Sequence, residues 1–117
     1  MWKVEYYEKE NGKIPVFDFI ESTDKKMMTR IFQKMRLLEE YGDTLKEPYS
    51  KYLQKGIFEL RVSSDTNISR IFYFFFWNKK IILTNGFIKK TQKTPKKEIE
   101  KALEYKKEFE RRHKNGF

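Results

Sequence analysis

Three strand patterns in succession constrain the fold of this chain more than any other feature. Residues 57–62 alternate between apolar and other side chains, which puts Glu59 and Arg61 together on the face opposite the apolar residues. A cluster of turn-forming residues separates them from residues 68–77, whose nearly continuous apolar run indicates a central strand covered on much of both faces. A second short turn leads into residues 81–88, a third strand pattern. Strands joined by turns this short run antiparallel, so the sequence predicts a meander.

The N-terminal part of the chain predicts one strand and two helices. Aromatic and β-branched residues at 2–7 favour a short opening strand. Pro15 suits the first turn of a short helix. A longer helix follows, capped by Ser22 or Thr23 and ended by Gly42, because methionine and aliphatic side chains recur there at helical spacing. Methionines at this spacing are expected to pack in the core rather than to form a binding surface.

The remaining segments complete an α+β domain. Residues 42–56 are polar and include Pro48, so we expect a loop. Thr94 is expected to cap a final helix whose first residue is Pro95. The predicted order is β-α-α-β-β-β-α, with the helices packed on one face of a small antiparallel sheet. With 117 residues and no Gly/Ser/Pro-rich linker, residues 1–117 are expected to form a single domain.

The residue inventory excludes several kinds of functional site. The chain has no cysteine, which rules out disulfides, thiolate metal sites and thiol nucleophiles. Its one histidine, His113, lies in a basic C-terminal stretch, so neither a histidine pair nor a His-rich metal site can form. Most carboxylates fall on predicted helix surfaces and loops, which leaves a two-metal carboxylate nuclease as a minor alternative. We therefore expect neither a metal nor a cofactor.

Membrane and export signals are also lacking in this sequence. The longest apolar run, residues 71–77, is far shorter than the roughly 20 residues that cross a bilayer. The first ten residues contain no apolar signal core. The sequence predicts a cytoplasmic protein without membrane contact.

The net charge of +9 comes from one interval of the chain. Between Asp65 and Glu98 there is no acidic residue, and the remainder of the chain is nearly neutral. A positive region attracts polyanions, so nucleic acid is the leading class of partner. The alternatives are a surface that only maintains solubility and one that meets an acidic protein. The basic residues of the interval are Arg70, Lys79, Lys80, Lys89, Lys90, Lys93, Lys96 and Lys97.

Two arginines stand in the middle of predicted strands. A buried guanidinium costs several kcal/mol unless it is paired, so Arg61 and Arg70 either pair with carboxylates or face a ligand. Glu59 shares a face with Arg61 and is a candidate for the pairing. An arginine that faces a ligand binds phosphate oxygens in bidentate fashion and stabilises the charge of a pentacovalent transition state.

Basic residues also follow the third predicted strand. Lys89, Lys90 and Lys93 come directly after Phe87, which is either a core ring or a ring on which an RNA base stacks. RNA is cut without a metal when its own 2′-OH is the nucleophile, and a lysine crowded by other cations loses its proton more easily than usual and serves as a base. The plainer interpretation is that these lysines only bind phosphate.

Three sequence strings, read together and in this order, resemble one family. Residues 55–61 (KGIFELR), 69–73 (SRIFY) and 86–95 (GFIKKTQKTP) are similar to the HigB-like, phage-derived branch of the RelE/ParE toxin superfamily. The resemblance spans essentially the whole chain and implies the RelE-like fold. It also implies a small basic ribonuclease, often ribosome-dependent, that cuts mRNA during translation and arrests growth until an antitoxin binds.

The resemblance also implies roles for particular residues. The family's strand arginines contact the scissile phosphate, and a basic position follows its last strand. Relatives often add a tyrosine or histidine near the C-terminus, whereas here that neighbourhood is Lys/Thr/Gln and Tyr105 lies within the predicted helix. The implied catalytic residues are Arg61, Arg70, Lys90 and Lys93, and the implied substrate-binding residues are Glu59, Phe87, Lys89 and Lys55.

The partners implied by the resemblance are a helix-turn-helix antitoxin of the HigA-like kind, the ribosome and mRNA, with operator DNA bound only through the antitoxin. The antitoxin either covers the basic residues or binds along the first two helices, and the methionines of the second helix slightly favour the remote mode. Two alternatives share the fold or the charge. One is a ParE-like toxin that targets DNA gyrase, and the other is a nucleic-acid-binding module without catalysis.

Overall fold

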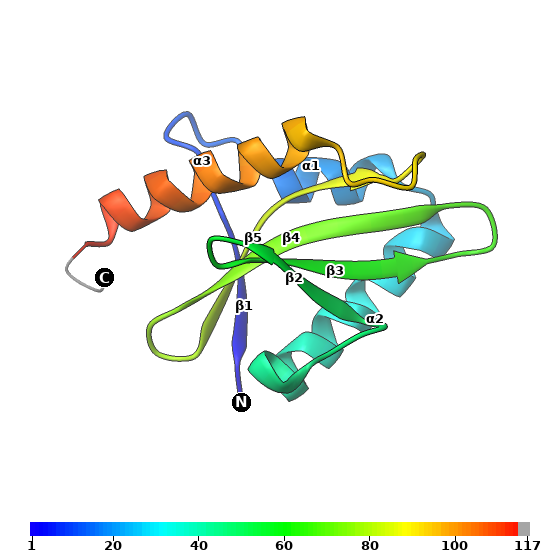
Figure 1. Cartoon of the computed structure of the whole chain (residues 1–117), viewed down its shortest axis with the longest axis horizontal. Coiled ribbons are helices and arrows are strands. Elements are labelled where there is room, and N and C mark those ends of the chain that lie inside the picture. The colour runs from blue at the N-terminus through cyan, green and yellow to red at the C-terminus, as the bar shows by residue number, and fades with distance from the viewer. Residues whose placement is uncertain (115–117) are drawn as a thin grey trace.

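The protein contains a five-stranded sheet with helices on both sides (Figure 1). The structure is a computed structural model that describes residues 1–114. The predicted α+β class is confirmed, and each predicted helix and strand is present. In chain order the elements are β1 (Lys3–Tyr6), α1 (Pro15–Ser22), α2 (Lys25–Tyr41), the 3-10 turn η1 (Gly42–Thr44), β2 (Ser50–Gln54), β3 (Ile57–Ser63), β4 (Ile68–Phe76), β5 (Lys80–Ile88) and α3 (Lys96–Arg112).

The strands lie in the order β1-β5-β4-β3-β2. The predicted meander is confirmed, because β3, β4 and β5 pair in antiparallel fashion. Two expectations are corrected. The sheet is mixed, since β1 pairs with β5 in parallel. Part of the expected loop at 42–56 forms β2, an edge strand with mostly exposed side chains that lacks the apolar alternation of a buried strand.

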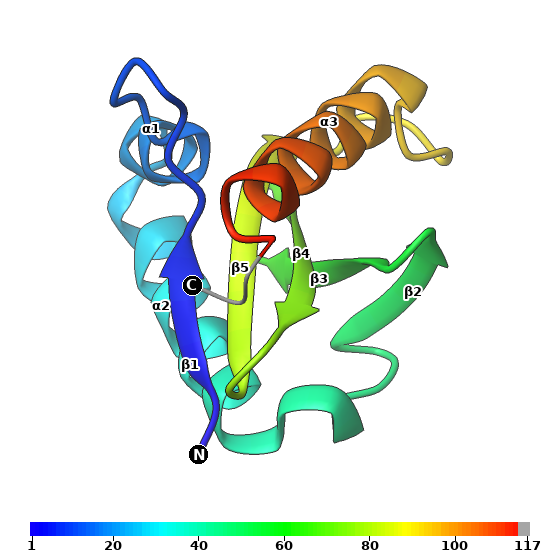
Figure 2. The ribbon, with the colours of Figure 1, turned by 90° about the vertical axis from the view of Figure 1, so that its left-hand side faces the viewer.

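Helices cover both faces of the sheet, not one face as expected (Figure 2). Helices α1 and α2 pack on the face that carries Ile71 and Tyr73, and α3 packs on the face that carries Phe72 and Phe74. Strand β4 therefore supplies alternate side chains to two cores, which is why its sequence is apolar on both faces. None of the helices in residues 1–114 is long and apolar enough to cross a membrane.

The ends of α2 explain how the chain enters and leaves this helix. Asp24, not Ser22 or Thr23, is the N-cap, because its Oδ1 accepts a hydrogen bond of 2.8 Å from the backbone N of Met27. Gly42 ends the helix as predicted, with a φ of 53°. A Cβ at this position would overlap the indole of Trp2, so the close approach of β1 also requires glycine. The expected core position of the methionines is confirmed for Met27, which is fully buried.

Candidate nucleic-acid interface

A carboxylate and two arginines share the face of the sheet that α3 covers. Arg61 of β3 lies opposite Arg70 of β4, and Arg70 lies opposite Phe87 of β5. Residues opposite one another on paired strands point to the same face. Glu59 precedes Arg61 by two residues and points the same way, as the alternation predicts.

Glu59 is the centre of this group. Its side chain is 1% exposed. Its Oε2 accepts a hydrogen bond of 3.3 Å from Arg61 Nε and lies 3.5 Å from Arg70 Nε. Its Oε1 accepts a hydrogen bond of 3.0 Å from Thr94 Oγ1. We call these four residues the Glu59 cluster. A carboxylate so buried and so occupied holds the arginines in place, which favours a positioning role over the substrate contact expected for Glu59.

Thr94 therefore differs from its prediction. It was expected to cap α3, yet Pro95 occupies the N-cap position and the Thr94 hydroxyl binds Glu59 instead. The hydroxyl ties the segment between β5 and α3 to the sheet. No sequence signal pointed to this contact, because Thr94 and Glu59 are 35 residues apart.

Arg70 combines burial with unused hydrogen-bonding capacity. The residue is 9% exposed, and its Nη1 donates a bond of 3.2 Å to the carbonyl of Ser69. Its Nε is near Glu59 but has no hydrogen-bond partner among the described residues. Burial lowers the pKa of Arg70, the charge of Glu59 opposes this shift, and the charge of Arg61 adds to it. A guanidinium stays protonated in proteins, so Arg70 is a positive charge with donors to spare.

An open hollow of about 470 Å³ lies beside Arg70. The backbone N of Lys89 donates to the carbonyl of Ile68 at 2.7 Å, which holds the lysine segment next to β4. Three of the expected site residues, Arg70, Lys89 and Lys90, line this hollow together. We call this space the Arg70 hollow, and its lining residues are Ile68, Arg70, Lys89, Lys90, Thr91 and Gln92.

Three of the expected site residues lie elsewhere. Phe87 is 9% exposed and its ring centroid is 5.5 Å from that of Phe72, so it is part of the core. Lys93 is exposed and outside the lining of the hollow. Lys55 is in the turn between β2 and β3. It precedes Arg61 by six residues, which in a strand corresponds to roughly 20 Å.

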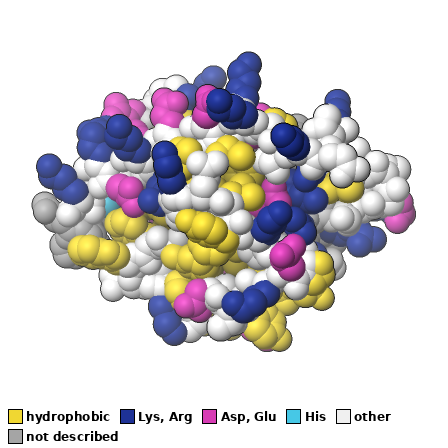
Figure 3. Space-filling model, viewed as in Figure 1, with side chains coloured by type: hydrophobic (Ala, Val, Ile, Leu, Met, Phe, Trp, Pro, Cys, Tyr) yellow, Lys and Arg dark blue, Asp and Glu magenta, His cyan; other side chains and the backbone are white. Residues whose placement is uncertain are grey.

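The basic interval found in the sequence is divided in space. Lys79 and Lys80 lie at the start of β5, whereas Lys89 and Lys90 follow its end. Nine residues of strand separate the two groups by roughly 30 Å. Lys80 also pairs with Glu5 at 3.6 Å. On the face that Figure 3 shows, Lys and Arg side chains are scattered and carboxylates lie among them. The basic interval therefore does not form one continuous positive surface, and Arg70, Lys89 and Lys90 are the members of it that line the Arg70 hollow.

The side chains at this surface suit an anion. Within residues 1–114, no three His, Cys, Asp or Glu side chains gather in the way that a metal ion requires. The two guanidinium groups and the lysines offer N–H donors and positive charge, which is what phosphate oxygens bind.

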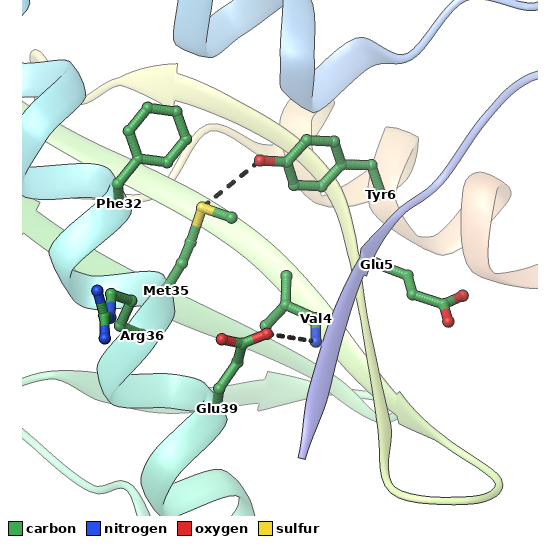
Figure 4. A pocket seen from close by; sticks show the side chains of 7 residues that line it. All are labelled: Val4, Glu5, Tyr6, Phe32, Met35, Arg36 and Glu39. Carbon is green, nitrogen blue, oxygen red and sulfur yellow. Dashed lines mark hydrogen bonds between the residues drawn. The ribbon is translucent and has the colours of Figure 1, made fainter. Parts of the chain in front are cut away.

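A second open space lies between β1 and α2, on the opposite face of the sheet from the Glu59 cluster (Figure 4). Met35 Sδ accepts a hydrogen bond of 3.8 Å from Tyr6 Oη, and Glu39 Oε2 accepts one of 3.2 Å from the backbone N of Val4. Burial, and then the charge of Glu39, raise the pKa of Tyr6. We call this space, of about 520 Å³, the β1–α2 groove, and its lining residues are Val4, Glu5, Tyr6, Phe32, Met35, Arg36 and Glu39.

Comparison with known protein families shows to which family this chain belongs. The family model described as "Phage derived protein Gp49-like (DUF891)" matches residues 18–107. The chain belongs to this family. The Gp49-like family is toxin-like and related to RelE, so the expected relation to RelE-like toxins is confirmed, and the HigB-like branch stays a prediction. The residues that match the family model include the Glu59 cluster, the Arg70 hollow and α2. No curated protein matches the chain significantly.

Proposed function

We propose that this Gp49-like protein is the toxin of a type II toxin–antitoxin pair and an endoribonuclease that cuts mRNA at the translating ribosome, as HigB-like toxins do. The observation that carries the proposal is the buried Glu59, which holds Arg61 and Arg70 side by side next to a hollow lined by Lys89 and Lys90. Two fixed guanidinium groups beside lysines suit a phosphodiester.

In this mechanism the scissile phosphate binds in the Arg70 hollow. The RNA 2′-OH attacks the phosphorus, the bond to the 5′ oxygen breaks, and the departing 5′ oxygen takes up a proton from water to become a 5′-OH. Arg61 and Arg70 stabilise the extra negative charge of the pentacovalent transition state. Lys90 lines the hollow and is our candidate for the group that accepts the 2′-OH proton, with the exposed Lys93 as its alternative. No cofactor takes part in this scheme.

The competing function is a toxin that targets DNA gyrase without cutting RNA, or a module that only binds nucleic acid. One observation favours these alternatives: Glu59 neutralises part of the charge of both arginines, as a purely structural ion cluster would. The fold alone does not distinguish these functions.

An order-of-inhibition experiment tests the proposal. The protein is induced in growing cells, and the incorporation of labelled amino acids and labelled thymidine is followed over time. An mRNA-cutting toxin stops translation first, whereas a gyrase poison stops DNA synthesis first. Earlier loss of DNA synthesis contradicts the proposal. A matched induction of Arg70→Ala, which removes the charge that lines the Arg70 hollow, controls for the effect of expression alone.

The toxin-like family supports an antitoxin partner. We assign the antitoxin to the β1–α2 groove and not to the Arg70 hollow. Tyr6 and Met35 give this groove an apolar surface, Phe32 is 43% exposed beside it, and Arg36 and Glu39 add charges of both signs. An amphipathic helix that buries its apolar face between polar flanks fits such a surface. Bound there, the antitoxin would prevent entry to the ribosome without touching the basic residues.

A further inference from the structure

Arg61 also lines a hollow that the nuclease mechanism above does not use. This space of about 280 Å³ lies on the β2 side of Arg61, whereas the Arg70 hollow lies toward β5. Arg30 and Lys34 come to it from α2, and Tyr49 comes from the segment before β2. We call it the Tyr49 hollow. Three cations and one aromatic ring, contributed by three separate parts of the chain, meet there.

The backbone of Tyr49 is held in position, and its ring remains accessible. The backbone N of Arg61 donates a bond of 2.9 Å to the Tyr49 carbonyl, which fixes this residue to β3. Lys34 Nζ lies 5.0 Å from the centre of the ring. The Tyr49 side chain is 43% exposed, so much of this large apolar ring is not buried by the protein itself. An aromatic ring next to cations is the arrangement on which single-stranded nucleic acids stack their bases.

On the side of the Tyr49 hollow, the guanidinium of Arg61 has only an exposed ion-pair partner. Its Nη1 lies 3.3 Å from Glu47 Oε1, and the Glu47 side chain is 65% exposed. An ion pair this exposed contributes little, so a phosphate can replace the carboxylate at small cost. The link to the buried Glu59 through Arg61 Nε would persist when that happens.

We propose that the Tyr49 hollow binds the nucleotide adjacent to the scissile phosphate, with its base on the Tyr49 ring and its phosphate between Arg30 and Arg61. The proposal rests on the function proposed above and extends it. Arg61 lines the Tyr49 hollow and Arg70 lines the Arg70 hollow, and the two arginines are opposite one another on paired strands, so the two hollows are neighbours. Single-stranded RNA then runs from α2 across β3 and β4 toward Lys90. An acidic peptide would use the cations but has no need of the ring.

The test measures RNA binding to the full-length protein by fluorescence anisotropy over a series of salt concentrations. The probe is a fluorescent single-stranded RNA with 2′-O-methyl groups, which prevents cleavage. Each phosphate contact to single strands contributes about 0.7 to the slope of log affinity against log salt. We expect Arg30→Ala to reduce this slope by about 0.7. Lys25→Ala removes the same charge from an exposed position of the same helix, outside the hollow, and is expected to leave the slope unchanged.

A second pair of variants tests the ring. Tyr49→Leu is expected to weaken RNA binding by at least about fivefold, the loss of one base–aromatic stack. Tyr49→Phe keeps the ring and is expected to bind within twofold of the wild type. Thermal unfolding checks that both variants are folded, and Arg30→Ala changes an exposed side chain, so it tests the hollow even if Tyr49→Leu does not fold.

The outcomes separate this proposal from the nuclease proposal. If wild-type protein cuts mRNA while Arg30→Ala and Tyr49→Leu bind RNA as the wild type does, the hollow has no role and only the present proposal is overturned. If wild-type protein binds the RNA through Arg30 and Tyr49 but cuts no mRNA on ribosomes, the hollow stands and the nuclease fails. The proposal is overturned if the wild type does not bind the RNA. It is also overturned if, in the same assay with a fluorescent acidic peptide, the variants lose affinity for the peptide but not for the RNA.

Discussion

Arg61 and Arg70 lie directly opposite one another on β3 and β4, with the buried carboxylate of Glu59 within 3.5 Å of both. Like charges in opposite positions on paired strands repel and destabilise a sheet. Here one carboxylate offsets the repulsion and keeps two guanidinium groups adjacent. The pair retains a net positive charge, and its remaining donors lie at the two hollows on either side of it. The arrangement is the anion site on which the proposed function rests, and Glu59 holds its two arginines together.

Replacement of Arg70 is expected to abolish toxicity without unfolding the protein. Arg70→Ala removes the charge that lines the Arg70 hollow, while Glu59 keeps its bonds to Arg61 and Thr94. Arg70→Lys retains the charge but not the planar fork, so it should restore only part of the activity. The measurements are growth after induction at matched expression and the circular dichroism of the purified variants. Full toxicity of Arg70→Ala would show that the site assignment is wrong.

Neutralising Glu59 should destabilise the fold more than removing either arginine. Glu59→Gln leaves two facing guanidinium groups without their shared carboxylate, and breaking such a buried ionic group costs about 3 kcal/mol. The free energy of unfolding is measured by urea denaturation. Thr94→Val is the comparison, because it removes one hydrogen bond to Glu59 and should cost about 1 kcal/mol. A Glu59→Gln variant as stable as the wild type would mean that the cluster does not need its central charge.

Local sequence signals predicted the three helices and four of the five strands, but not the contacts between residues far apart in the chain. Alternation in residues 57–62 correctly placed Glu59 and Arg61 on one face, since that pattern depends only on the neighbouring residues. The parallel pairing of β1 with β5 joins residues such as Lys3 and Lys80, and nothing near either residue signals it. Strand β2 was not predicted because an exposed edge strand needs no apolar face. Its hydrogen bonds with β3 define it as a strand.

Some residues of the candidate site could be found from the sequence and others could not. Arg61 and Arg70 were found because charges within strands are unusual. Thr94 and Glu47 were missed, since each is an ordinary polar residue in a loop and gains its role only when the chain brings it to Glu59 or Arg61. Phe87 could be assigned either way from sequence because aromatic residues in strands have the same local pattern whether they face a core or a ligand.

The junction between the N-terminal segment and α3 is expected to weaken in acid. Tyr7 Oη donates a bond of 2.7 Å to Glu108 Oε1. Burial alone would raise the pKa of Glu108, but the hydrogen bonds from Tyr7 and Arg112 and the charges of Arg112 and Arg111 lower it overall. Stabilisation of this kind is present above the unfolded pKa of about 4.3 and is lost as the pH falls through the lower folded value.

Tyr7→Phe tests this linkage. The variant should lose about 1 kcal/mol of stability at neutral pH, and the difference from the wild type should shrink below the folded pKa of Glu108. Urea denaturation over a series of pH values gives both quantities. Tyr41→Phe changes an exposed tyrosine and should match the wild type throughout. A difference between Tyr7→Phe and the wild type that stays constant with pH would show that the Glu108 charge is not involved.

The ends of the RNA products should identify the nucleophile. Attack by the 2′-OH leaves a 2′,3′-cyclic phosphate, or the 3′-phosphate derived from it, on the upstream fragment and a 5′-OH on the downstream fragment. Cleavage should continue in EDTA when the integrity of the ribosome is controlled. The ends are distinguished by ligation and by kinase labelling of the fragments. A 5′-phosphate on the downstream fragment would contradict this mechanism.

The antitoxin prediction separates inhibition at the β1–α2 groove from occupation of the Arg70 hollow. Substituting Lys89, Lys90 and Lys93 together by Glu should abolish RNA cutting but leave antitoxin affinity unchanged. Phe32→Glu puts a charge beside the groove and should weaken the antitoxin by more than about tenfold, or 1.4 kcal/mol, while cutting continues. Phe17→Glu is the matched control, because Phe17 and Phe32 are each 43% exposed and only Phe32 lines the groove. Affinity is measured by titration calorimetry, and a tenfold loss in the lysine variant would instead place the antitoxin over the basic residues.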